Sequence, residues 1–220
     1  MPDFTRPNSE SDFYFVEANE PEIAATRIVE PVKSRIPGRF HLDPIRDIQV
    51  LCPMNRGGVG ARSLNLVLQA ALNPAGDRKV ERFGWVFAPK DKVMQIENDY
   101  DKEVYNGDVG YVEDVDPDTA ELSINFDGRS VAYGFAELDT LVPAYAATIH
   151  KSQGSEYPAV VIPVLTQHYT MLQRNLLYTG VTRGKKLVGL VGQKKAVAMA
   201  VRNSSARRRW SRLDEWLKRK

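Results

Sequence analysis

Apolar residues form two kinds of stretch along the first 78 positions, and the two kinds alternate. Residues 12–18 are a short aromatic-rich run and residues 47–54 a continuous apolar run, both typical of buried strands. Residues 21–37 and 61–72 carry apolar side chains three and four positions apart, which predicts helices. The predicted apolar faces consist of Ile23, Ile28, Val29 and Val32 in the first helix and of Leu64, Val67, Leu68 and Leu72 in the second. Strands that alternate with helices predict a parallel α/β sheet.

The pattern changes between residues 79 and 142, where no helical period occurs. Short alternating runs are separated by turn signals, which include Asn106-Gly107 and Asp127-Gly128, dipeptides that are favoured in tight hairpins. Short strands at close spacing predict a small β-barrel. About 60 residues suit a small domain, so we expect this segment to be an insertion in the α/β domain.

The α/β pattern resumes after residue 142, with an apolar run after a polar loop, a helical stretch, a strand and a second helical stretch. We therefore predict an α/β fold interrupted by a small β-barrel. The predicted segments are a disordered lead (1–11), a first α/β part (12–78), the insertion (79–142), a second α/β part (143–205) and a basic tail (206–220).

Composition and charge exclude several classes of protein. The hydrophobic fraction of 43% can bury a core of ordinary size, and the net charge of +2 is too small for a chain that coats nucleic acid through charge alone. The last 20 residues contain eight of the 30 basic residues and only two acidic ones. This basic end suggests a polyanion nearby, and a solvated helix end explains it equally well.

Other features of the composition concern redox chemistry and location. The single cysteine, Cys52, excludes an internal disulfide and a cysteine metal site. No run approaches the roughly 20 apolar residues of a membrane span, and the polar N-terminus does not resemble a signal peptide. We therefore expect a cytoplasmic protein without a membrane partner.

Three polar stretches carry candidate chemistry. "IHKSQGSEYP" leads directly into a buried strand, where His150 and Lys151 can contact phosphate, Gly154 permits close backbone approach, and Glu156 can accept from ribose hydroxyls. "LLYTGVTRGKK" places Arg183 after a helix, as a surface ion pair or an arginine finger. "CPMNRGGVGARSLN" places Arg56 in a glycine-rich turn after a strand. Each stretch alone is a weak signal.

In this order the three stretches resemble motifs IV, V and VI of superfamily 1 DNA helicases, above all the RecD-like helicases. This family includes the exodeoxyribonuclease V alpha subunit and relatives of the helicase parts of conjugative relaxases. "QVLCPMNRGGVGARSLN" is similar to motif IV, "YAATIHKSQGSEYPAVVIPV" to motif V, and "NLLYTGVTRGKKLVGLVG" to motif VI. "DKVMQIENDYDKEVYNGDVGYVEDVD" is similar to the SH3-like 2B domain of this family. The resemblance covers about residues 12–212 and implies a RecA-like domain 2A with an SH3-like 2B insertion.

The resemblance also implies roles for individual residues. Arg183 matches the motif VI arginine that contacts the γ-phosphate of ATP. The nucleotide-facing positions are Gln153, Gly154, Glu156 and, more weakly, Arg56. The positions that face single-stranded DNA are Thr148, His150, Lys151 and Ser152. The family further implies 5′-to-3′ movement on single-stranded DNA.

One part of such a motor is missing from the sequence. No G-x-x-x-x-G-K-[ST] phosphate loop is present, and no acidic pair follows a buried strand. We therefore expect ATP and Mg²⁺ to require an N-terminal RecA-like domain 1A of the same protein, and this chain alone to be inactive. A non-enzymatic nucleic-acid-binding module and a superfamily 1 RNA helicase fragment stay open as alternatives.

Overall fold

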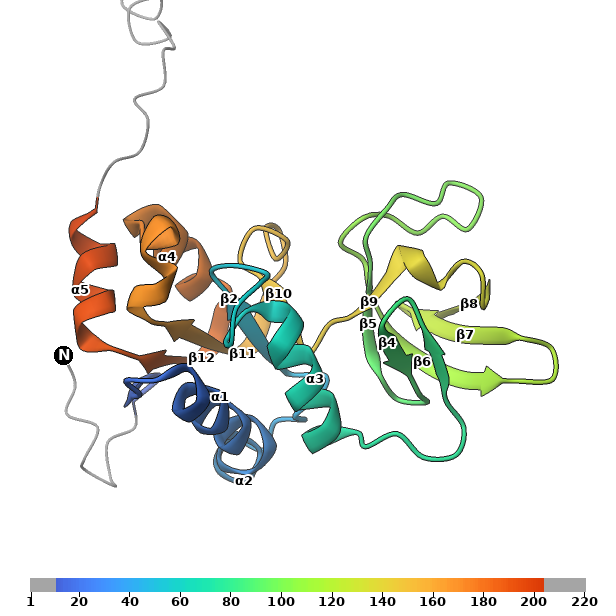
Figure 1. Cartoon of the computed structure of the whole chain (residues 1–220), viewed down its shortest axis with the longest axis horizontal. Helices are drawn as coiled ribbons and strands as arrows, with labels where there is room; N and C mark the ends of the chain where they lie inside the picture. The colour runs from blue at the N-terminus through green and yellow to red at the C-terminus, as the bar shows by residue number, and fades with distance from the viewer. Residues whose placement is uncertain (1–10, 204–220) are drawn as a thin grey trace, which may run out of the picture.

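The computed structural model describes residues 11–203, so the basic tail and almost all of the predicted lead lie outside the described residues. A parallel sheet with strand order β1-β12-β11-β2-β10 lies beside an antiparallel sheet with order β8-β7-β6-β5-β9 (Figure 1). The predicted fold class, an α/β domain interrupted by a small β unit, is confirmed.

The parallel sheet has helices on both faces. Its strands are β1 (Phe13–Glu17), β2 (Ile48–Cys52), β10 (Ala146–Thr148), β11 (Tyr157–Val164) and β12 (Gly184–Gly192). One face is covered by α1 (Pro21–Glu30), the π-helical η1 (Pro31–Arg35), α2 (Ile36–Phe40) and α3 (Ala61–Leu72), and the other by the 3₁₀ segment η3 (Thr166–Met171), α4 (Arg174–Val181) and α5 (Lys194–Arg202). No helix within residues 11–203 is long and apolar enough to cross a membrane.

Two predicted helix faces differ from the observed ones. Ile23 and Val67 are 41% and 43% exposed, although both were expected in the core. In α3 the buried face includes Asn65 and Gln69 instead. The Asn65 amide donates to the Ala146 carbonyl and accepts from the Ala146 N–H, both at 2.8 Å, so it completes the hydrogen bonding of the edge strand β10.

The antiparallel unit encloses a core of its own. Its elements are β3 (Val80–Arg82), β4 (Trp85–Phe87), β5 (Lys92–Gln95), β6 (Val109–Asp116), β7 (Glu121–Phe126), β8 (Arg129–Gly134), η2 (Leu138–Thr140) and β9 (Leu141–Pro143). Asp127-Gly128 forms the predicted tight hairpin turn, with φ angles of 49° and 88°. Asn106-Gly107 does not: it lies near the end of the long connection 96–108 between β5 and β6.

A two-residue junction, Ala144-Tyr145, connects β9 of the antiparallel unit directly to β10 of the parallel sheet. Its backbone is hydrogen-bonded on both sides. The Ala144 N–H donates to the Lys92 carbonyl, and the Tyr145 carbonyl accepts from the Val50 N–H. The buried Gln49 amide donates to both junction carbonyls, at 3.0 and 3.2 Å. The junction is therefore built into both sheets.

A buried carboxylate, Asp91, ties the two units together beside this junction. It accepts from Gln69 (2.6 Å) and Asn73 (2.7 Å) at the end of α3, from the Tyr145 hydroxyl (2.6 Å) and from the Ala88 N–H (2.7 Å). Burial raises the pKa of the Asp91 carboxyl, and the four donors oppose that rise. One side chain thus joins α3, the junction and the antiparallel unit.

Lys92, the next residue, is also buried between the units. It is 1% exposed, and its ammonium lies 5.5 Å from the centre of the Tyr157 ring at the start of β11. Its Nζ has no hydrogen-bond partner among the residues that the structure describes. Burial lowers the pKa of Lys92 from 10.5 to about 8, although Asp43 and Asp47 favour the charged form.

Asp91→Ala should lower the free energy of unfolding by about 3 kcal/mol or more, because it leaves several buried donors without an acceptor. Chemical denaturation measures this effect. Asp114→Ala is the matched control, since Asp114 forms an exposed ion pair with Arg78 in the same unit and its loss should change stability little. Equal effects of the two substitutions would contradict the structural role of Asp91.

Lys92→Met should raise stability at pH 7 by about 1–3 kcal/mol, because the charged form is disfavoured in the fold. The wild-type protein binds fewer protons at Lys92 when folded than when unfolded between pH 8 and 10.5, so its stability should rise across that window. The difference in free energy of unfolding between Lys92→Met and the wild type should therefore become smaller between pH 8 and 10.5. Thermal denaturation across this pH range tests the sign, with the exposed Lys79→Met as control.

Candidate functional site

The loop 149–156, part of the predicted motif V, runs from the carboxyl ends of the parallel strands back to their amino ends. Strands β10 and β11 both pair with β2 in parallel. Thr148, the last residue of β10, pairs with Cys52 at the carboxyl end of β2, whereas Ala159 near the start of β11 pairs with Ile48 at its amino end. The loop must therefore return along the sheet. As a result, some of the predicted residues lie at the carboxyl ends of the strands and others at the amino ends.

Thr148, His150 and Lys151, predicted to face DNA, lie at the start of the loop. Thr148 is half-buried, and the side chains of His150 and Lys151 are exposed. The Lys151 N–H donates to the Thr148 carbonyl (3.0 Å), which closes a tight turn. Partial burial lowers the pKa of Lys151. These three residues are available at one surface, as a contact with a strand of DNA would require.

Ser152 requires a correction. Its side chain is fully buried and its hydroxyl donates to the Ile149 carbonyl at 2.8 Å. The prediction that this side chain contacts DNA is wrong in this structure, because a hydroxyl that closes the turn from inside is not accessible to a ligand. Sequence reasoning could not separate it from its polar neighbours, since a turn residue and a contact residue look alike in a polar loop.

Arg183 lies at the amino ends of the parallel strands, directly before β12. The Tyr157 N–H donates to the Arg183 carbonyl at 2.8 Å, and Tyr157 pairs with Gly184 where β11 and β12 begin. The Arg183 guanidinium is half-buried, and its Nη1 donates to the carbonyl of Ser155 at 3.0 Å. The structure thus joins the predicted motif VI arginine to the end of the predicted motif V loop.

Two further hydrogen bonds orient the Arg183 side chain. Its Nε donates to the Thr179 carbonyl (3.3 Å) and its Nη2 to the Thr182 hydroxyl (3.4 Å). A guanidinium has five N–H donors, so the three bonds formed within residues 11–203 leave one N–H on each terminal nitrogen. A held guanidinium with two remaining donors suits a phosphate that binds in bidentate fashion.

The predicted nucleotide-facing residues Gln153, Gly154 and Glu156 are all exposed. Gly154 has a φ of 90°, which a residue with a side chain rarely adopts. The Glu156 carboxylate pairs with Lys185 at 2.8 Å, and this contact holds the pKa of Glu156 below its usual range. Both partners are more than half exposed, so a ligand can replace the pair at little cost.

Arg56 lies on the exposed loop between β2 and α3, as predicted for motif IV. The first backbone donors of α3 do not point to an open anion site, however. The Ala61 and Arg62 N–H groups donate to the carbonyls of Met54 and Asn55 at 3.1 and 3.0 Å. Anion binding at this helix end would therefore depend on the Arg56 side chain itself, and that role stays a prediction.

A groove of about 380 Å³ lies where the two units meet. It brings Thr148 and Lys151 together with two residues that were not among the predicted site residues, Arg62 of α3 and Trp85 of β4. The Arg62 guanidinium lies 5.1 Å from the centre of the Trp85 ring. The closely spaced aromatic residues of "FGW" were a possible signal for Trp85, but nothing in the sequence places this residue beside motif V.

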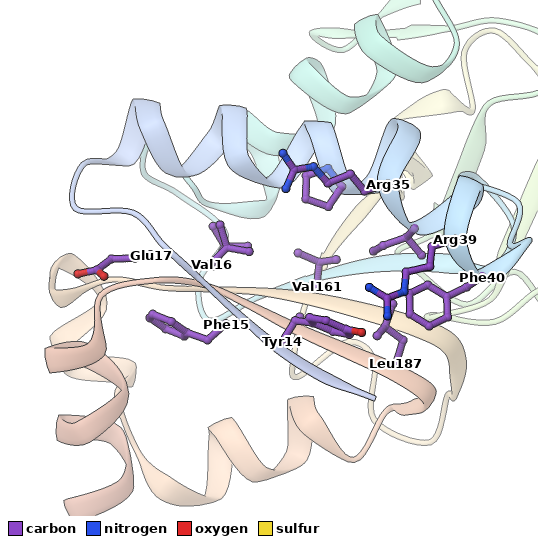
Figure 2. A pocket seen from close by; sticks show the side chains of 13 residues that line it. Tyr14, Phe15, Val16, Glu17, Arg35, Arg39, Phe40, Val161 and Leu187 are labelled. Atoms are coloured by element: carbon purple, nitrogen blue, oxygen red, sulfur yellow. The ribbon is translucent and has the colours of Figure 1, made fainter. Parts of the chain in front are cut away.

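A separate pocket of about 450 Å³ lies between β1 and the α1–α2 segment, away from all predicted site residues. Figure 2 shows Arg39 close to Tyr14 and Phe40 in this pocket; its guanidinium lies 5.7 Å and 5.6 Å from the two ring centres. The lining is mainly apolar, with Val161 and Leu187 of the sheet below (Figure 2). None of the residues predicted to contact nucleotide or DNA lines this pocket.

Two protein-family models match the chain. Residues 64–126 match the ATP-dependent RecD-like DNA helicase SH3 domain, and residues 143–191 match the UvrD-like helicase C-terminal domain. The first match covers most of the antiparallel unit, and the second covers the segment from β9 to β12 that contains the predicted motifs V and VI. The resemblance inferred from the three motifs is thereby confirmed.

Curated relatives agree with these matches. The ATP-dependent RecD2 DNA helicase of Deinococcus radiodurans is 41% identical over 138 residues, which cover 63% of this chain and 19% of that protein. The RecBCD enzyme subunit RecD of Mycolicibacterium smegmatis is 31% identical over 169 residues, which cover 77% of this chain and 29% of that protein. The matched chain therefore corresponds to less than a third of either relative.

A solved structure shares the fold. A crystal structure of Pif1 helicase from Bacteroides in complex with ADP-AlF3 and ssDNA superposes with a TM-score of 0.53 at 16% identity, over 80% of this chain and 46% of that one. This likeness supports the arrangement of the elements alone. The two family matches and the curated relatives show that the chain is related to RecD-like helicases, with one segment similar to their SH3 domain and another similar to the UvrD-like helicase C-terminal domain.

Proposed function

We propose that the chain is the part of an ATP-dependent RecD-like DNA helicase that supplies the arginine finger and part of the grip on single-stranded DNA. The observation that carries this proposal is the hydrogen bond from Arg183 to the Ser155 carbonyl. It connects the residue proposed to contact the γ-phosphate with the loop whose other end bears His150 and Lys151. The RecD and RecD2 relatives support the same activity.

The residues present fit one side of an ATP site. Arg183 is held by three hydrogen bonds within the described residues and retains two N–H donors for phosphate oxygens. Gln153, Gly154 and Glu156 are exposed and lie next to Ser155 in the chain, whose carbonyl accepts from Arg183. ATP would supply the phosphoryl group, and Mg²⁺ would neutralise its charge.

Within residues 11–203 no group of three His, Cys, Asp or Glu side chains could hold a metal ion. The phosphate loop and Mg²⁺ ligands would therefore come from an N-terminal RecA-like domain of the same protein, without which the chain is inactive toward ATP.

The loop 149–156 gives a physical route from nucleotide to DNA. A ligand that draws the Arg183 guanidinium toward itself also pulls on Ser155, through a bond of 3.0 Å. The loop is short, and the turn that Ser152 closes from inside connects Ser155 to Lys151. A change in nucleotide state would thus alter the grip on the strand, and repeated cycles would give stepping, 5′-to-3′ by family resemblance.

The two alternatives predict different behaviour. A non-enzymatic binding module would not require the Arg183 guanidinium to be held with two remaining N–H donors at the amino ends of the strands, away from the residues proposed to face DNA. A superfamily 1 RNA helicase would share the same motifs, and the relatives named RecD and RecD2 favour DNA. Competition between single-stranded DNA and RNA of equal length distinguishes these two substrates.

Arg183→Lys in the whole protein should reduce kcat for ATP hydrolysis by about 10³-fold or more, because lysine keeps the charge but lacks the planar fork. Single-strand affinity without nucleotide should stay near the wild-type value. Steady-state hydrolysis and a DNA titration measure the two quantities. Hydrolysis near the wild-type rate would show that Arg183 only anchors the loop, and an unchanged melting temperature excludes loss of folding as the cause of a defect.

The double variant His150→Ala/Lys151→Ala should behave in the reverse way. It should weaken single-strand binding and reduce the salt dependence of the binding constant, because fewer counterions are released. The salt slope, measured at several salt concentrations, is the decisive quantity. An unchanged slope would remove these two residues from the proposed DNA contact, while the assignment of Arg183 would stand.

A further inference from the structure

The hairpin of β3 and β4 has an unusual residue at its tip. Arg82 pairs with Trp85, so Phe83 and Gly84 form a two-residue turn, with φ angles of 52° and 75°. Turns with two positive φ angles strongly prefer Asn-Gly or Asp-Gly, as at Asp127-Gly128 in this same unit. A bulky aromatic residue in the left-handed region is strained. The turn would fold more easily without this ring.

Packing does not explain the ring either. Phe83 is 54% exposed and belongs to none of the hydrophobic clusters of the described residues. Trp85, two positions on, packs partly against the core of the antiparallel unit instead. A side chain that is both strained in its backbone and exposed to solvent contributes little to the fold, which points to a role in binding.

The surroundings of the tip indicate what it binds. The Arg62 guanidinium lies over the Trp85 ring, and its Nη2 would lie 3.5 Å from a methyl group placed on Gly84. Arg62 thus holds the hairpin tip against the start of α3, directly after the motif IV loop. Arg62 and Trp85 line the groove that also contains Thr148 and Lys151. Aromatic faces beside basic groups are the usual composition of a single-strand site.

We propose that Phe83 is a base-stacking residue, against which a base of single-stranded DNA lies where the strand passes the groove. The proposal rests on the proposed function, because Lys151 and Thr148, which line the same groove as Trp85 at the base of the hairpin turn, are the groups expected to hold the phosphates. Stacking needs only the π-face of a base, so the contact is independent of sequence. The hairpin tip, placed in the antiparallel unit, extends the grip beyond the motifs of the α/β domain.

Phe83→Asn tests this role without harming the fold, because asparagine is the preferred residue at this turn position. In the 220-residue chain its melting temperature should equal or exceed that of the wild type. Its affinity for a short labelled thymidine oligonucleotide, measured by fluorescence anisotropy, should fall about fivefold or more. Phe83→Trp should retain binding. Asp127→Asn, in the other turn of this kind, is the matched control and should not weaken binding.

An abasic oligonucleotide with the same number of phosphates separates stacking from charge. The wild-type chain should bind the thymidine strand more tightly than the abasic strand, and Phe83→Asn should reduce that preference. Thymidine binding of Phe83→Asn equal to that of the wild type would overturn the stacking role and leave the proposed function intact. A wild-type chain that binds neither strand would instead overturn the proposed single-strand grip, and the role of Phe83 with it.

Discussion

Strand β2 pairs in parallel with β10 on one side and with β11 on the other, and the site depends on this arrangement. Two parallel strands cannot be joined by a tight turn, so the chain between them must return along the sheet. The returning loop is packed against α4: a methyl group on Gly180 would lie 3.1 Å from Ile149 and 3.0 Å from Ile162. Because α4 leads into Arg183, the sheet order brings the arginine and the loop together.

Polar groups fix the orientation in which the antiparallel unit meets the parallel sheet, beside a small apolar cluster of Met94, Ala144 and Ala147. Asp91 binds donors from α3, from the junction and from its own unit, while Gln49 holds the junction carbonyls. Such bonds are directional, so they fix an orientation that non-directional apolar burial would leave variable. That orientation creates the groove between the two units, which Trp85 lines together with Lys151.

Periodicity predicted the elements well where the buried face of an element is apolar. The run 47–54 contains β2, and the helical spacing in 61–72 corresponds to α3. The same spacing misplaced Val67 and gave no sign of Asn65 or Gln69, because these amides are buried to satisfy backbone and carboxylate groups that are distant in sequence. A hydrophobic pattern contains no information about such partners.

The sequence alone indicated most strands and helices of the α/β part, though not β10, as well as the change to short antiparallel strands after residue 79 and the three motifs with their RecD-like resemblance. All of these features can be recognised from residues that are close together in the sequence: from the spacing of apolar side chains, from the residues preferred in turns, and from short motifs. Only the tertiary structure decided that Ser152 points inward, that Arg183 binds the Ser155 carbonyl, and that Asp91 joins the two units. These contacts depend on how strands distant in sequence pair and on which side chains that pairing removes from water, and neither is set by local sequence.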